Sequence, residues 1–270
     1  MGRLFVCNTS SDNISVVDLS EFKEENKISL KLSNMDRVGP HGICTYNNKL
    51  LISNNYSNTI SIVDIDEGRE IESHFIGMHC NDAVVYEDKA YVICGETNYV
   101  MVFDLIHGRV EEEIPCGNLP HSIAINKQKK LILISNFESD SLTIVDLEDK
   151  RNITQIRVGA YPTKALFTVD GEHIIVCESN IGTDMRGDIN ILSLKGFKLL
   201  NKILVGKYPV DMYLNTSHCF VSNFGDGSVS QVDINNYKEV KKINVGGMPR
   251  GIINVGEYIY DKLIKALIDD

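Results

Sequence analysis

LISNNYSNTISIVDIDEGREIESHFIGMHC, residues 51–80, has the pattern of a strand, a polar turn, a second strand that ends in Asp64, and a third strand. The same order of residue types returns at 131–162 in LILISNFESDSLTIVDLEDKRNITQIRVGAYP and at 220–249 in FVSNFGDGSVSQVDINNYKEVKKINVGGMP. Three weaker copies occupy most of the remaining chain. The sequence is therefore an array of six repeats.

The spacing within the repeat is constant. Five copies end in proline and one ends in Cys80; the prolines are Pro40, Pro120, Pro162, Pro209 and Pro249. The middle strand of each copy ends in Asp18, Asp64, Asp104, Asp146, Ser193 or Asp233. From that position to the next proline or Cys80 the separation is 16 residues in five copies and 22 in the N-terminal copy. Such regularity indicates one structural unit repeated six times.

Composition and charge narrow the class of protein. The 270 residues are 43% hydrophobic and 24% charged, as in globular proteins, and the net charge of −10 disfavours binding to nucleic acid or to an anionic membrane. The sequence contains neither a secretory signal pattern nor an apolar run of about 18 residues. Its seven cysteines form no CxxC pair, which favours buried thiols in a reducing compartment. We therefore expect a cytoplasmic protein without membrane insertion.

Each repeat also has a short apolar segment after its proline, as in GICTY at 42–46, so a full repeat contains four predicted strands. These segments are rich in Val and Ile and are bounded by Asn, Asp, Ser and Gly, which is typical of β-strands. A period of about 40 residues with four strands predicts the blades of a β-propeller, and hence an all-β fold. WD-type repeats are excluded because the chain has no tryptophan.

The copies resemble the YVTN-repeat β-propeller family. The matching pieces are ISNNYSNTISIVD, ISNFESDSLTIVD and VSNFGDGSVSQVD, together with the Gly-x-x-Pro steps GNLP, GAYP, GKYP and GGMP. The resemblance covers nearly the whole chain apart from its C-terminal tail. It implies a ring of four-stranded blades, although the family often builds seven blades.

Counting the predicted strands gives six blades. Six inner strands follow the proline position, at 42–46, 82–86, 122–126, 164–168, 211–214 and 251–255. The first three strands of the chain have no inner strand ahead of them, and 251–255 has no outer strands behind it. We therefore expect 251–255 to join the first three strands and close the ring, which removes exposed sheet edges. The propeller domain is predicted to span 1–256.

Residues 257–270 have a different pattern. Apolar residues lie at helical spacing, at Tyr260, Leu263, Ile264, Leu267 and Ile268. This tail is predicted to be a short amphipathic helix that packs on the propeller, and docking to a partner is the alternative.

Propeller topology places the loop before each inner strand at the mouth of the central channel. The residues directly after the proline position are His41, Asn81, His121, Thr163, Val210 and Arg250. The next positions are Gly42, Asp82, Ser122, Lys164, Asp211 and Gly251. Because these residues differ from blade to blade and most are polar or charged, they are candidates for binding rather than for folding. The predicted ligand-binding set is His41, Asn81, Asp82, His121, Lys164, Glu178, Asp211 and Arg250.

Glu178 enters this set from a second tier, the end of the second strand of each repeat. The residues there are Asn8, Asn54, Cys94, Asn136, Glu178 and Asn223. Recurrent Asn is expected to cap the turn, whereas Glu178 breaks the series beside an insertion at 180–187. The insertion indicates either a ligand site or a tolerated loop. Cys94 is expected to be buried and inert, with a reactive thiol as the alternative.

Several residues of the predicted channel mouth carry atoms that can bind a metal ion. His41, His121, Asp82, Glu178 and Asp211 carry metal-ligand atoms, but the two histidines lie two blades apart, so we expect no metal and no other cofactor. No nucleophile, zinc-protease or nucleotide-binding motif is present.

The sequence favours a non-enzymatic scaffold that binds a protein or small-molecule ligand at the channel mouth, with no nucleic-acid partner. The alternative is a lyase or hydrolase resembling streptogramin lyases or lactonase-type propellers. In such an enzyme His41 or His121 would be the base, with or without a divalent ion. Fold alone does not separate the two.

Overall fold

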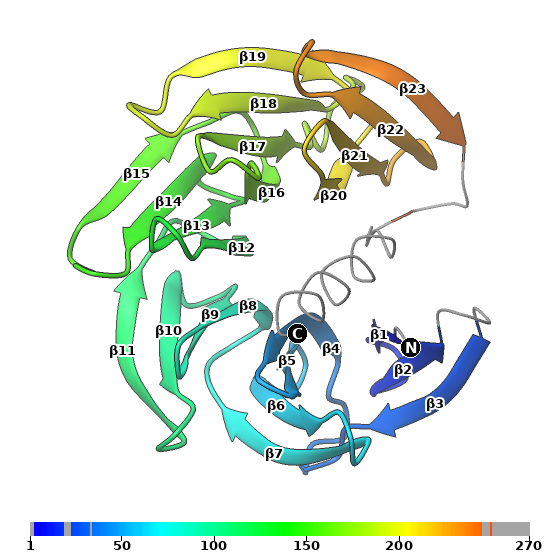
Figure 1. Cartoon of the computed structure of the whole chain (residues 1–270), viewed down its shortest axis with the longest axis vertical. Helices are drawn as coiled ribbons and strands as arrows, with labels where there is room; N and C mark the ends of the chain where they lie inside the picture. The colour runs from blue at the N-terminus through cyan, green and yellow to red at the C-terminus, as the bar shows by residue number, and fades with distance from the viewer. Residues whose placement is uncertain (1–2, 19–22, 33, 245–248, 250–270) are drawn as a thin grey trace, which may run out of the picture.

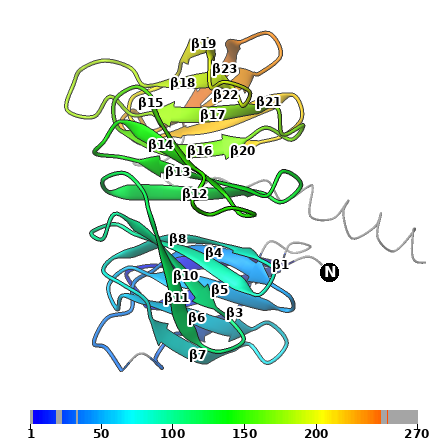
Figure 2. The same cartoon turned by 90° about the vertical axis from the view of Figure 1, so that its left-hand side faces the viewer.

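Six antiparallel β-sheets follow one another around a common centre (Figure 1). The computed structural model describes residues 3–18, 23–32, 34–244 and 249, and within these residues the only regular elements are strands. Each sheet is formed by strands that are consecutive in the sequence. Seen from the side in Figure 2, the inner strands β8 and β12 of neighbouring sheets lie near the middle of the molecule.

The first sheet contains β1 (Arg3–Asn8), β2 (Asn13–Asp18) and β3 (Lys23–Ser29). The second contains β4 (Pro40–Tyr46), β5 (Lys49–Asn54), β6 (Thr59–Asp64) and β7 (Arg69–Phe75). The third contains β8 (Cys80–Tyr86), β9 (Lys89–Cys94), β10 (Tyr99–Asp104) and β11 (Arg109–Pro115). The fourth contains β12 (Pro120–Asn126), β13 (Leu131–Asn136), β14 (Ser141–Asp146) and β15 (Ile153–Arg157). The fifth contains β16 (Pro162–Phe167), β17 (His173–Glu178), β18 (Asp188–Ser193) and β19 (Leu199–Leu204). The sixth contains β20 (Pro209–Leu214), β21 (His218–Asn223), β22 (Ser228–Asp233) and β23 (Lys238–Asn244).

This arrangement confirms the predicted six-bladed β-propeller. Five blades have four described strands and the first has three. The expected closing strand at 251–255, the domain boundary at 256 and the helix at 257–270 lie outside the described residues. Among the described residues, no helix is long and apolar enough to cross a bilayer.

The core lies between the blades. The second strands β5, β9, β13 and β17 are buried at every position after the first, because each of their sheets packs between two others. Their sequences accordingly contain runs of consecutive apolar residues, and three of the four strands end in a buried polar residue, Asn54, Asn136 or Glu178. Leu51 of β5, for example, shares one cluster with Val92 of the next blade. Burial of one such side chain contributes about 1.5–3 kcal/mol.

All five described inner strands begin two residues earlier than predicted, at the proline or Cys80 itself. In addition, β16 ends one residue earlier than predicted. Pro40 pairs with Asn54, and the register then shifts by one residue before Gly42 pairs with Ser53. A proline fits the first position of a strand because no ladder hydrogen bond is needed from it there. The alternation of apolar residues in the sequence starts only after this register shift, at Gly42 in the second blade.

The recurrence of an aspartate at the end of the third strand in five copies of the repeat indicates a turn cap rather than a catalytic group, and the structure confirms it. Asp64 Oδ1 accepts hydrogen bonds of 2.9 Å from the backbone N–H groups of both Asp66 and Glu67. Asp104, Asp146 and Asp233 accept equivalent pairs in their blades. These carboxylates are therefore structural.

Substitution of Asp64 by alanine is expected to lower the free energy of unfolding by about 1 kcal/mol, because two backbone donors lose their acceptor on a solvated turn. Urea denaturation of Asp64→Ala measures this. Glu67→Ala in the same turn is the control, since the Glu67 side chain pairs with Arg69 on the surface and the substitution leaves its backbone N–H in place, so its effect should stay within about 0.5 kcal/mol. Loss of ligand binding by Asp64→Ala without loss of stability would contradict the structural assignment.

Candidate functional site

A β-bulge positions the residue after each proline. The register shifts skip His41, Asn81, His121, Thr163 and Val210 on the inner strands of five successive blades. A bulged residue is freed from the ladder and its side chain is redirected. The predicted first tier of the channel mouth is thus produced by one backbone irregularity that recurs in every described blade of four strands.

The two bulge histidines are held in the same way. His41 Nδ1 lies 2.8 Å from the carbonyl oxygen of Asn81, and His121 Nδ1 lies 2.7 Å from that of Thr163. Each acceptor is the bulge residue of the next blade. A carbonyl oxygen only accepts, so Nδ1 carries a hydrogen in each histidine, and in the neutral form of the ring Nε2 presents a lone pair. Both imidazoles are therefore oriented as hydrogen-bond acceptors or bases through Nε2.

Lys164 brings charges from three blades together. Its Nζ lies 3.8 Å from Asp82 Oδ2 of the third blade and 3.6 Å from Asp211 Oδ1 of the sixth. Each carboxylate is also fixed by the N–H of the residue that follows it, Ala83 or Met212, at 2.9 Å. Burial opposes protonation of Lys164, but the charges of Asp82 and Asp211 outweigh it and raise its pKa above the ordinary value. The three side chains are only 19–25% exposed to solvent, and their ion pairs link the third, fifth and sixth blades.

His121 is neutral at pH 7. Its ring stacks on Phe137 with the ring centres 5.7 Å apart. Burial lowers the pKa of His121 below the ordinary value, and positive charge on His41 or Lys164 lowers it further. The hydrogen bond to the Thr163 carbonyl and the negative charge of Asp82 raise the pKa of His121, but they do not outweigh the lowering.

The predicted set therefore falls into three parts. His41, Asn81, Asp82, His121, Lys164 and Asp211 all lie on the first two positions after the proline or Cys80, and their side chains bond between blades. Arg250 lies outside the described residues. Glu178 belongs to a separate, buried cluster.

The tier that contains Glu178 has mainly a structural role. Asn54 Nδ2 donates to Thr59 Oγ1 at 3.0 Å and to Ser61 Oγ at 2.8 Å, and Asn136 and Asn223 bond in the same way to hydroxyls of the next strand. The asparagine thus spans the turn to the following strand instead of capping its backbone. Asn136 and Asn223 also accept the N–H of the glycine in the Gly-x-x-Pro step.

In the fifth blade, acidic and amide groups replace this neutral arrangement. Glu178 accepts the Gly159 N–H at 2.6 Å and a hydrogen bond from Asn190, while Asp188 takes the place of the first hydroxyl. Lys202 Nζ lies 2.7 Å from Asp188 Oδ1 and 3.6 Å from Glu178 Oε2. Burial and the charge of Asp188 raise the pKa of Glu178. The insertion at 180–187 contributes Asn180, which donates to Asp188 at 3.1 Å.

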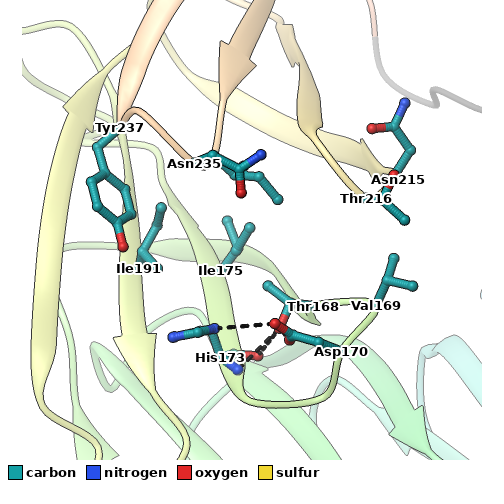
Figure 3. Close-up of a pocket in the computed structure, with 11 residues that line it drawn as sticks. Thr168, Val169, Asp170, His173, Ile175, Ile191, Asn215, Thr216, Asn235 and Tyr237 are labelled. Carbon is teal, nitrogen blue, oxygen red and sulfur yellow. Dashed lines mark hydrogen bonds and ion pairs between the residues drawn. The ribbon is translucent and has the colours of Figure 1, made fainter.

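Two other features were not found from the sequence. A cavity of about 350 Å³ lies between the fifth and sixth blades (Figure 3), with Ile175 and Ile191 among its lining residues and His173, Asp170 and Tyr237 at its edge. The signal for it is the connection 168–172, the longest between the first and second strands of any described blade. The second feature is a group formed by Asp104, His107 and Glu111, whose ligand atoms lie within 4.8 Å of one another. Its sequence signal is His107, because no other copy of the repeat has a histidine three residues after the end of the third strand.

Comparison with known proteins supports the fold. No protein-family model matches the chain. No curated protein matches it either. Among solved structures, hydrazine synthase of Kuenenia stuttgartiensis is similar, with 18% identity and a TM-score of 0.78 over 92% of this chain and 84% of that one. The computationally designed protein Ika8 is similar at 10% identity with a TM-score of 0.68, over 92% and 73% of the two chains. At such identities the likeness shows the propeller fold alone.

The lowered pKa of His121 predicts a pH-dependent contribution to stability. That contribution is complete above about pH 6.5, the ordinary pKa of histidine, and is lost as the pH falls through the lower folded-state pKa, because the unfolded state takes up the proton first. His121→Gln should therefore lose less stability than the parent between pH 7.5 and pH 5. Urea denaturation at several pH values measures the difference. Identical losses in the parent and in His121→Gln would disprove the prediction.

Lys202→Met is expected to destabilise the protein by about 2 kcal/mol at pH 7, because Glu178 and Asp188 lose their shared cation; half-exposure of Lys202 keeps the loss below that of a fully buried pair. The loss should shrink near pH 4, where the raised pKa of Glu178 favours its neutral form. The matched control is Lys242→Met, which occupies the same register position in the sixth blade and pairs with Asp226 at the surface. Equal effects of the two substitutions would contradict this account.

Proposed function

We propose that this protein is a YVTN-type β-propeller that binds a small ligand at the channel mouth without transforming it. The observation that carries the proposal is the bridge from Lys164 to Asp82 and Asp211, at 3.8 and 3.6 Å, across three blades. A residue that served only to fold its own blade would not need partners from two others. The repeat motifs support the family assignment within this proposal.

Among the described residues of the mouth, charged and imidazole acceptors outnumber the cationic donor Lys164. Asp82 and Asp211 together carry two negative charges against the one positive charge of Lys164, and His41 and His121 each present an Nε2 lone pair. Such a surface favours a small molecule with several hydrogen-bond donors. Binding would exchange the ion pairs of Lys164, at 3.8 and 3.6 Å, for direct contacts with the ligand.

The test is thermal denaturation with a panel of divalent metal ions and small carboxylic acids, amines and polyols. A ligand at about 100 times its dissociation constant adds about 2.7 kcal/mol, which corresponds to a Tm rise on the order of 5–10 °C for a chain of this size. We expect Lys164→Met to lose the shift caused by any compound that stabilises the parent. The control, Lys242→Met, should keep it. A shift that persists in Lys164→Met would place binding elsewhere.

An enzyme of the lyase or hydrolase class is the second candidate, and the orientation of the histidines favours it. Because the bonded Nδ1 fixes the tautomer, Nε2 of His121 or His41 is available as a general base. A divalent ion that raises the Tm of the parent but not of the double variant His41→Ala/His121→Ala would favour this alternative. Stabilisation by metal-free compounds alone would favour the binding protein.

A further inference from the structure

The third blade departs from the repeat at two positions that face each other. Cys80 stands where the other described four-stranded blades have Pro40, Pro120, Pro162 and Pro209. Cys94 stands where three of them have asparagine and one has Glu178. In the structure Cys80 is paired with Cys94, as Pro40 is with Asn54. The two exceptions to the repeat are therefore one cross-strand pair.

The repeat itself explains why this pair is close. A proline has no N–H, so the position it occupies is a non-hydrogen-bonded pair of the antiparallel ladder. The backbone bond lies one step outside: Gly95 N–H donates to the His79 carbonyl at 2.9 Å, as Asn55 N–H donates to that of Gly39. Non-hydrogen-bonded pairs bring Cα atoms to about 4.5 Å, which lies within the range that a disulfide can span.

The sulfur atoms are already in contact. Cys80 Sγ lies 3.5 Å from Cys94 Sγ and 3.2 Å from the Gly77 carbonyl, and both side chains are fully buried. The hydrogen bond from Cys80 and burial raise the pKa of the Cys94 thiol, so at neutral pH little thiolate is present in the closed state. Cys80 is the first residue of β8 and Cys94 is the last residue of β9. Local opening at this end of the two strands is therefore the route by which a reagent reaches the thiols.

We propose that Cys80 and Cys94 are a redox modification site, at which a low-molecular-weight disulfide such as oxidised glutathione converts the two thiols into a cross-strand disulfide. This inference is independent of the ligand proposed for the channel mouth. The bond would link the first two strands of the third blade directly before the bulge that carries Asn81.

The exchange takes two steps. The thiolate of one cysteine attacks the disulfide of oxidised glutathione, whose S–S bond breaks and releases one glutathione thiolate. The second cysteine then attacks the resulting mixed disulfide, forms the Cys80–Cys94 bond and releases the second glutathione. The two protons of the cysteines are taken up by the two released glutathione thiolates. The protein is oxidised by two electrons and glutathione disulfide is reduced by two.

Tryptic mapping under non-reducing conditions tests the site. Trypsin cleaves after Arg69, Lys89 and Arg109, so Cys80 and Cys94 are the single cysteines of peptides 70–89 and 90–109. After incubation with oxidised glutathione, we expect these peptides to be linked and two of the seven thiols to be lost. The Tm should rise on the order of 5 °C, because the bond closes a loop of about 15 residues. Parallel incubations at urea concentrations below the unfolding transition accelerate opening of the strand end.

The matched control is the double variant Cys80→Pro/Cys94→Asn, which restores the residues of the other blades and therefore keeps the fold. It should retain all of its remaining thiols and show no change in Tm with the oxidant. Three results would overturn the proposal: no loss of thiols in the parent, a linkage between other cysteines such as Cys177 and Cys219, or a glutathione adduct that does not proceed to the linked peptides.

Discussion

The non-hydrogen-bonded position at the start of each described inner strand is the constraint on which these blades depend, and proline, which has no N–H, occupies it in four of the five. At the start of an inner strand, proline fits only where the ladder needs no donor, and that fixes the register of the strand against its neighbour. The next residue is then extruded as a bulge, as seen where Pro40 pairs with Asn54 and Gly42 with Ser53. The bulged side chain leaves the plane of the blade and reaches the backbone of the following blade. The third blade has the same register and the same bulge with Cys80 in place of proline, so this position of the ladder sets register and bulge together, and proline is one residue that fits it.

The architecture was predictable because its signals are local and repeated. Strands such as LILIS and the aspartate that ends each third strand recur at fixed spacing, and the structure confirms six blades and the turn-capping role of Asp64 and its equivalents. The exact start of the inner strands was not predictable from apolar alternation. The bulge interrupts that alternation at His41 and its counterparts, so the pattern begins after it.

The candidate site was predictable only in part. Differences between copies at two adjacent positions of the repeat made His41, His121 and Lys164 candidates, because folding alone asks for the same residue in each blade. The bridge from Lys164 to Asp82 depends on the distance across two blades, which no spacing in the sequence reports. Glu178 occupies the end of a second strand, where side chains point between strands, so its burial follows from strand geometry and not from its charge.

The bonds at the bulges all run one way around the ring. His41 uses the carbonyl of the blade after it, and so does His121; Thr163 donates to the Pro209 carbonyl in the same sense at 2.8 Å. A bulge side chain of one blade therefore donates a hydrogen bond to the backbone of the next blade along the chain. If one blade is replaced by another from the array, the inserted blade keeps its own donor side chain but meets the carbonyl group of a new following blade. The blade before it must then bond to the backbone of the inserted blade. Exchanging one whole blade therefore changes two junctions, one with the blade before it and one with the blade after it.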